Sequence, residues 1–268
     1  MEAHVIYAEL EVKACTAEIY LNGFPLSRLV PPTTYFEATA AEEYLISGEN
    51  ELEILIEPAP RPSQARIERR DLATPGASAT ARVVRYPEGA FTEPENGEIL
   101  AEVNWLGRPE VAVFPQSIAR TFALGTRSAR WAWQDAPPLV LDEPLVLEAR
   151  ATLDEVARAL RNGSVDAFWK ATRVRTREGM QAYPAIREDE ARAELETLLA
   201  YYRQFPDPVL PFRPERHDFR LVARDRVLHC VDDDGSASLR LKNPEDDGDI
   251  VPYPLFLARI GERLEVVR

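Results

Sequence analysis

Residues 51–57 read Glu-Leu-Glu-Ile-Leu-Ile-Glu, and this stretch decides the fold of the first half of the chain. Successive side chains of a β-strand point to opposite faces, so one face of this stretch is apolar and the other is acidic. The apolar face consists of Leu52, Ile54 and Ile56, and the acidic face carries Glu51, Glu53 and Glu57. Such a strand is typical of an antiparallel sheet that has one face in water.

The same alternation predicts further strands on both sides of this stretch. In residues 4–12, Glu9 and Glu11 share one face, and the opposite face is apolar. The pair Asn22-Gly23 predicts a tight turn after a short strand at 18–21. Other strands are predicted at 81–86, 98–105, 111–114, 118–124, 129–134 and 139–149, with a long loop at 58–81. Together they predict an all-β antiparallel sandwich domain over residues 1–149.

The hydrophobic period changes near residue 150, and residues 150–268 predict an α+β domain. Thr152 and Glu155 have the spacing of a capping box, which predicts a helix that begins at Thr152 and ends at Gly163. A shorter helix is predicted after Ser164 and a long one at 187–205, whereas residues 172–183 are ambiguous. Strands are predicted at 218–223, 226–231, 238–242, 253–260 and 263–267. We therefore expect three helices packed on a curved antiparallel sheet.

Two resemblances accompany this division. Residues 20–25 (Tyr-Leu-Asn-Gly-Phe-Pro) and 45–56 (Leu-Ile-Ser-Gly-Glu-Asn-Glu-Leu-Glu-Ile-Leu-Ile) resemble the jelly-roll domains that accompany many glycoside hydrolases. The second half, from 151 onward, resembles the cone-shaped ketosteroid-isomerase-like fold in the order of its elements. That superfamily includes isomerases, cyclases, hydrolases and members without activity. No motif transfers a catalytic residue to this chain, and a fold alone does not set function.

Composition excludes several classes of function. The chain has 268 residues and a formal net charge of −13, which argues against nucleic acids and anionic membranes as partners. No stretch has the length and hydropathy of a membrane span, and the first residues do not resemble a secretory signal. We therefore expect a cytoplasmic protein. The two cysteines, Cys15 and Cys230, are too few for a disulfide framework or a cysteine-built zinc site.

The search for catalytic or metal-binding chemistry yields no strong motif. The three histidines lack metal-ligand spacing, and the acidic stretches 232–236 and 246–249 predict hairpin turns rather than calcium loops. No phosphate loop or nucleophile elbow is present, so no catalytic residue, metal or cofactor is predicted. One alternative is a pocket in the second domain. Its candidate lining residues are Asp166, Trp169, Tyr183 and His217.

Another alternative is a carbohydrate-binding first domain. Trp131 and Trp133 are two residues apart, so they share a face of the strand predicted at 129–134. Two indoles on one face can stack on a sugar ring, but aromatic pairs more often belong to a core. The sequence favours the core for this pair.

The uneven distribution of charge leads to the main functional hypothesis. Residues 1–60 contain eleven acidic and two basic residues, so this segment has a net charge of −9. Acidic surface raises the rate at which a cationic partner is met, although it also serves solubility alone. We expect a non-enzymatic module that binds a basic protein, as a bacterial immunity protein does. The residues expected to bind the partner are Glu9, Glu11, Glu51, Glu53 and Glu57.

Overall fold

A computed structural model of the chain describes most of its residues. The described ranges are 4–30, 35–57, 68–71, 76–89, 96–108, 111–125, 130–204, 208–210, 213–233, 235–242 and 250–268. Contacts within the chain group it into two compact units, the first extending to Arg130 and the second starting at Trp131. Among the described residues, no helix is long and apolar enough to cross a membrane.

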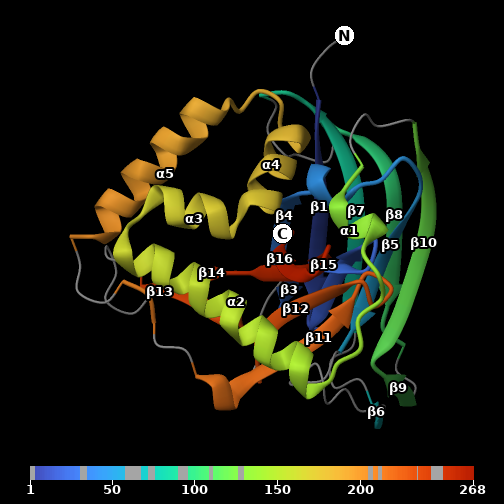
Figure 1. The fold of residues 1–268 in the computed structure, drawn as a ribbon. Coiled ribbons are helices and arrows are strands. Elements are labelled where there is room, and N and C mark those ends of the chain that lie inside the picture. The colour runs from blue at the N-terminus through green and yellow to red at the C-terminus, as the bar shows by residue number, and fades with distance from the viewer. Residues whose placement is uncertain are drawn as a thin grey trace. The chain divides into compact units, whose positions relative to one another are not determined.

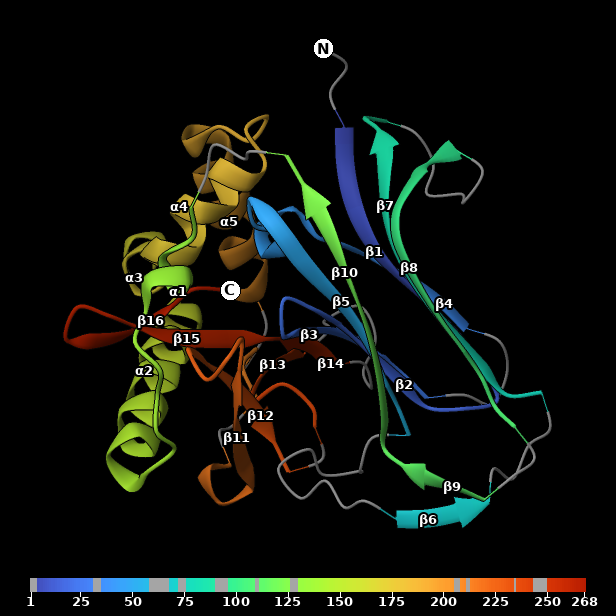
Figure 2. The same cartoon turned by 90° about the vertical axis from the view of Figure 1, so that its right-hand side faces the viewer.

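The first unit is built from antiparallel strands (Figure 1). One four-stranded sheet has the order β4-β1-β7-β8, a second has the order β10-β5-β2-β3, and β6 pairs with β9. Figure 2 shows β5 beside β10, as their pairing requires. The strands are β1 (His4–Lys13), β2 (Ala17–Leu21), β3 (Phe24–Leu29), β4 (Tyr35–Ala40), β5 (Gly48–Ile56), β6 (Glu68–Asp71), β7 (Ser78–Pro87), β8 (Glu98–Leu106), β9 (Val111–Phe114) and β10 (Gln116–Leu124), and a 3-10 turn, η1, spans Glu42–Tyr44.

The two four-stranded sheets share one hydrophobic core, to which β5 contributes every second residue. Leu52, Ile54 and Ile56 are each 0% exposed. Ile54 lies between Ile19 of β2 and Ile118 of β10 in the register of the sheet. Burying each such side chain contributes roughly 1.5–3 kcal/mol to folding. The side chains that the sequence alternation assigns to the apolar face are therefore the ones buried in this core.

The two halves of the jelly-roll-like motif meet in the structure. Asn22 and Gly23 form the turn between β2 and β3 with φ angles of 52° and 81°, a left-handed geometry that Asn and Gly tolerate best. The Asn22 side-chain amide donates to Asn50 Oδ1 (2.8 Å), and Asn22 Oδ1 accepts the backbone N–H of Glu51 (3.0 Å). These bonds hold the hairpin against the start of β5.

The second unit combines helices with a four-stranded antiparallel sheet of order β11-β12-β15-β16 and a β13-β14 pair. Side chains of α2 pack with the sheet residues Leu228, Cys230 and Leu257 in one core. The helices are α1 (Ala132–Asp135), α2 (Glu143–Asn162), α3 (Val165–Ala171), α4 (Arg173–Ala182) and α5 (Glu188–Tyr202), with a 3-10 turn, η4, at Pro214–Arg216. The strands are β11 (His217–Val222), β12 (Val227–Asp232), β13 (Leu239–Lys242), β14 (Ile250–Tyr253), β15 (Leu255–Ile260) and β16 (Arg263–Val266).

The structure confirms the coarse prediction of a β-rich first part followed by a mixed α and β part. It corrects the helix count, because the described residues contain five α-helices rather than three. Of the strand predicted at 129–134, residue 129 lies outside the described residues, and residues 130–134 are not a strand but lead into α1. The ambiguous segment 172–183 contains α4. The predicted strand at 139–149 is wrong because α2 begins at Glu143. The predicted domain boundary between residues 149 and 150 consequently falls inside this helix.

The early start of α2 has a local cause. The Asp142 side chain accepts the backbone N–H of Leu145 (2.9 Å), so Asp142 is the N-cap, and Pro144 suits the first turn of a helix. Thr152, the predicted N-cap, lies in the middle of the helix and donates its hydroxyl to the Glu148 carbonyl (3.1 Å).

The two candidate caps give a direct test of where α2 begins. Asp142→Ala should lower the free energy of unfolding by about 1 kcal/mol, because it leaves N–H groups of the first turn without an acceptor. Thr152→Ala should change it by less than about 0.5 kcal/mol, because alanine suits a helix interior. Urea unfolding followed by circular dichroism measures both. A larger loss for Thr152→Ala than for Asp142→Ala would contradict this helix start.

Candidate functional site

The five glutamates expected to bind a partner do not form one surface. Glu9 and Glu11 belong to β1 of the first sheet, whereas Glu51 and Glu53 belong to β5 of the second. The two sheets enclose a shared core, so their outward faces point away from each other. Glu57 follows the last residue of β5, where its carboxylate accepts the backbone N–H of Thr16 (3.0 Å).

Glu9 is buried rather than outward and exposed. It is 1% exposed, and its carboxylate accepts a hydrogen bond from the Tyr86 hydroxyl. Burial raises the pKa of Glu9, and the Tyr86 bond and the nearby Arg82 only partly offset this effect. Beside it, Gly97 approaches Val84 and Tyr86 so closely that a Cβ there would lie 2.3 Å from Val84 Cγ1. Glu9 is therefore placed inside the fold, where it cannot contact a partner.

Three other acidic side chains of the first sheet, Glu11, Glu98 and Glu102, lie near arginines. Arg82 of β7 lies 2.6 Å from Glu102 of β8 and 4.0 Å from Glu11. Arg85 lies 2.9 Å from Glu98. Strands β1, β7 and β8 therefore carry exposed charges of both signs, whereas Glu37 of β4 accepts a hydrogen bond from the Ser27 hydroxyl.

The outward face of β5 is different. Glu49, Glu51 and Glu53 follow one another on this face at every second residue, about 7 Å apart. No Lys or Arg of the described residues forms an ion pair with any of the three. Glu53 accepts a hydrogen bond from the Ser117 hydroxyl (2.5 Å). We call these three glutamates the β5 acidic face. Glu49 was missed by the sequence analysis, although it simply extends the alternation one step before Glu51.

The neighbouring strand leaves the β5 acidic face open. In the register with β10, Glu49, Glu51 and Glu53 lie opposite Ala123, Thr121 and Ala119. These three β10 residues are small and exposed. On the other side of β5, β2 places the uncharged Tyr20 opposite Glu53. The carboxylates repel one another across water, and a cationic surface brought against them relieves that repulsion.

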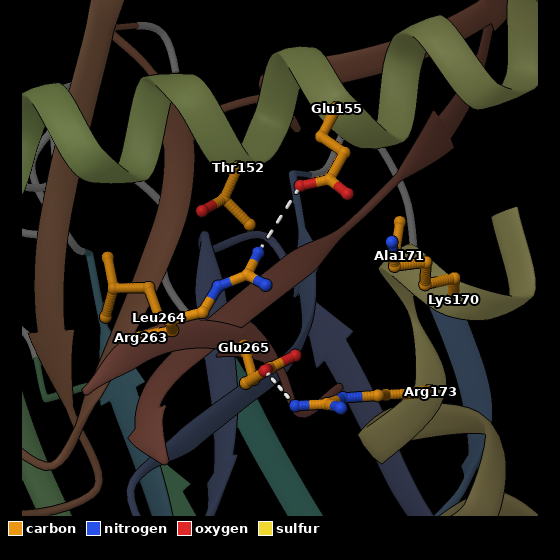
Figure 3. Close-up of a pocket in the computed structure, with 8 residues that line it drawn as sticks. All are labelled: Thr152, Glu155, Lys170, Ala171, Arg173, Arg263, Leu264 and Glu265. Atoms are coloured by element: carbon orange, nitrogen blue, oxygen red, sulfur yellow. Dashed lines mark hydrogen bonds and ion pairs between the residues drawn. The ribbon is translucent and has the colours of Figure 1, made fainter. Parts of the chain in front are cut away.

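A small pocket in the second unit lies between α2, the end of α3, the start of α4 and β16 (Figure 3). Two ion pairs cross it, Arg263 with Glu155 of α2 (3.6 Å) and Arg173 of α4 with Glu265 (2.5 Å). Its free volume is about 30 Å³, which accommodates one or two water molecules, whereas sites for organic ligands typically measure roughly 300–1,000 Å³. The pocket is therefore a polar junction between helices and sheet and is too small for an organic ligand.

The predicted pocket residues are only partly brought together. Arg192 of α5 pairs with Asp166 of α3 and lies over the ring of Trp169, 4.9 Å from its centroid. Tyr183 follows the last residue of α4, and His217 begins β11. None of the four lines the pocket of Figure 3 or a second, open groove at the start of α2.

His217 belongs to a separate buried cluster of charges. It lies opposite Asp232 in the β11–β12 register, with 3.9 Å between His217 Nε2 and Asp232 Oδ1, and Arg240 Nη2 lies 3.1 Å from Asp232 Oδ2. Burial lowers the pKa of His217 to about 4, and Arg150 and Arg240 add to this effect against the opposing Glu215. At neutral pH the histidine is therefore uncharged, and Arg240 balances the Asp232 charge.

The two indoles proposed as a sugar platform are buried. Trp131 is 1% and Trp133 6% exposed. The guanidinium of Arg268 lies over the Trp131 ring, 5.0 Å from its centroid, and pairs with Glu178 (2.6 Å). The core interpretation of these tryptophans is confirmed.

Of the acidic turns, the one at 232–236 is described in part, and the one at 246–249 lies outside the described residues. Gly235 donates its N–H to the Asp232 carbonyl (2.9 Å), and Val231 bridges to Ala237 across the turn. In the described part of the chain, no group of three or more His, Cys, Asp or Glu residues is placed to hold a metal ion.

Comparison of the chain with protein-family models, curated proteins and solved structures found no match.

The burial of Glu9 makes stability depend on pH in a defined direction. A carboxyl whose pKa is raised by folding destabilises the folded state when it is ionised. The loss of stability due to Glu9 therefore grows as pH rises from about 4.5, the usual pKa of glutamate, through the pKa of Glu9 in the folded state. Glu9→Gln keeps an acceptor for Tyr86 without the charge. Its free energy of unfolding, measured with urea, should exceed that of the wild type at pH 7, and the excess should shrink toward pH 4.5.

Glu11→Gln, at an exposed position of the same strand, is the control and should change little at either pH. A Glu9→Gln variant that is less stable than the wild type at pH 7 would show that the ionised carboxylate stabilises the fold.

Proposed function

We propose that this protein is a non-enzymatic binding module that captures a basic protein through the β5 acidic face. The observation that carries the proposal is the run of Glu49, Glu51 and Glu53 without a cationic partner among the described residues. On the other sheet, Arg82 and Arg85 lie within ion-pair distance of Glu11, Glu98 and Glu102. The contrast supports a face that is left uncompensated for a partner.

The physical basis of binding is complementary charge. A face of one sign attracts a basic surface over about one Debye length, 8–10 Å at physiological salt, and so raises the association rate. The net charge of −13 adds to this attraction and repels nucleic acids. An immunity-type protein that neutralises a basic enzyme or toxin is the kind of role that we infer, with a cytoplasmic location.

Fewer observations support the alternative functions. The carbohydrate-binding alternative relied on exposed indoles at Trp131 and Trp133, which are buried. The alternative of a small-molecule or catalytic site relied on a shared pocket for Asp166, Trp169, Tyr183 and His217, and no observation favours it. The jelly-roll and ketosteroid-isomerase-like resemblances stay predictions, and the proposed binding does not depend on them.

The test is partner capture with charge reversal. The protein should carry its tag at the N-terminus, because Arg268 is buried. Isolated from its native cell at low salt, it should retain a stoichiometric basic partner that high salt releases. Glu49→Lys, Glu51→Lys and Glu53→Lys combined should weaken binding to that purified partner on the order of 100-fold.

A control variant with the same change in net charge combines Glu194→Lys, Glu196→Lys and Glu262→Lys, three exposed positions of the second unit. It should keep most of the affinity. Equal losses for the two triple variants would mean that total charge, not the β5 acidic face, governs binding. A partner that is not basic, or whose binding ignores salt, would overturn the proposal.

A further inference from the structure

A groove lies where the chain enters α2. Its volume is about 230 Å³. The walls are mostly proline and aliphatic side chains, and its polar members are Asp142, Glu148 and Arg259. The apolar members are Pro137, Pro138, Leu139, Val140, Pro144 and Leu145. We call this feature the α2 groove.

The groove is held open by its own structure. Leu139 and Leu145 are 7% and 5% exposed and anchor the walls in the core of the second unit. The Leu139 N–H donates to the Asp225 carbonyl (2.7 Å), and Asp142 caps the helix. Prolines further restrict the backbone. Because the groove residues are already ordered, binding a partner costs them little conformational entropy.

Two of the polar lining residues form an ion pair with each other. Glu148 lies 2.7 Å from Arg259 and also accepts the backbone N–H of Leu264 (2.8 Å). Burial alone would raise the pKa of Glu148, but these two hydrogen bonds outweigh it and lower the pKa. Glu148 thus stays ionised at neutral pH and occupies Arg259.

Large aliphatic side chains stand exposed beside the groove. Val140 is 74%, Leu141 46% and Leu147 57% exposed. Isolated apolar residues on a surface are normal, but three large aliphatic side chains exposed within eight residues make this segment a candidate for a protein contact.

The charge around the patch selects the partner. At the start of α2, Asp142 and Glu143 are exposed. Glu148 is already paired with Arg259, and Arg226 donates to the backbone carbonyls of Gln134 and Ala136, so Asp142 and Glu143 are the acidic residues left to face a partner. An apolar segment that carries basic residues suits this rim, whereas an acidic segment or a second copy of the same patch would bring like charges together.

We propose that the α2 groove docks a segment of the basic partner in which a Leu-like side chain is flanked by Lys or Arg. This inference rests on the proposed function and names a second, apolar contact for the same partner. The aliphatic side chain enters the groove, and the flanking cations face Asp142 and Glu143. Affinity at this contact comes from apolar burial and is therefore less sensitive to salt than at the β5 acidic face.

The experiment uses two synthetic peptides of equal length and equal Lys content, one with Leu and the other with Ser between the lysines. Calorimetry should show that the Leu peptide binds the whole chain at least about tenfold more tightly than the Ser peptide. Amide shifts in the NMR spectrum should change at residues 139–147. Equal affinities, or shifts elsewhere only, would overturn the proposal.

Variants locate the contact. Val140→Ser with Leu147→Ser should weaken the Leu peptide about tenfold. Ile186→Ser with Leu198→Ser, at positions 43% and 45% exposed in the same unit, is the matched control and should leave its affinity unchanged. Equal effects of the two double variants would contradict docking in the α2 groove.

Charge reversal at Glu49, Glu51 and Glu53 separates this inference from the proposed function. If charge reversal abolishes capture of the native partner but Val140→Ser with Leu147→Ser leaves Leu-peptide binding unchanged, docking in the α2 groove is overturned and the proposed function stands. If instead Val140→Ser with Leu147→Ser abolishes Leu-peptide binding but charge reversal leaves partner capture unchanged, docking in the α2 groove is supported and binding through the β5 acidic face is overturned.

Discussion

The structure of the first unit depends on the alternation of side chains along β5. Leu52, Ile54 and Ile56 must face the shared core of the two sheets, where each is fully buried. The same alternation turns Glu49, Glu51 and Glu53 outward. A slip of one residue would bury three carboxylates and expose three core side chains, so the register is strongly specified. The bonds from Asn22 to Asn50 and Glu51 fix it from the neighbouring hairpin.

What makes the outward glutamates functional candidates is the composition of the strands around them. On the first sheet, Arg82 and Arg85 of β7 lie within reach of the acidic residues on their neighbours. Next to β5, the corresponding positions of β10 are Ala119, Thr121 and Ala123, which are too short and uncharged to compensate. On its other side, β5 pairs with β2, which places Tyr20 opposite Glu53, so neither neighbouring strand places a Lys or Arg opposite these glutamates.

Local patterns in the sequence predicted local structure well. The strand at 111–114 has its predicted bounds, and the inward and outward residues of β5 are those of the alternation. Facts that depend on distant residues could not be read this way. The residues next to Glu9 in the sequence do not indicate that it bonds to Tyr86, which lies 77 residues away. The start of α2 was missed because the runs Leu-Val-Leu at 139–141 and 145–147 are typical of strands, whereas the cap at Asp142 between them begins a helix. That error also hid the α2 groove.

The central claim, an uncompensated acidic face on β5, can be tested without any partner. Paramagnetic relaxation of amide protons, measured with a cationic and an anionic soluble probe, reports the potential near each residue. The account predicts strong enrichment of the cationic probe at residues 49–53 and 119–123 and nearly equal effects of the two probes around Arg82 and Glu102. Equal effects of both probes along β5 and β10 would contradict it.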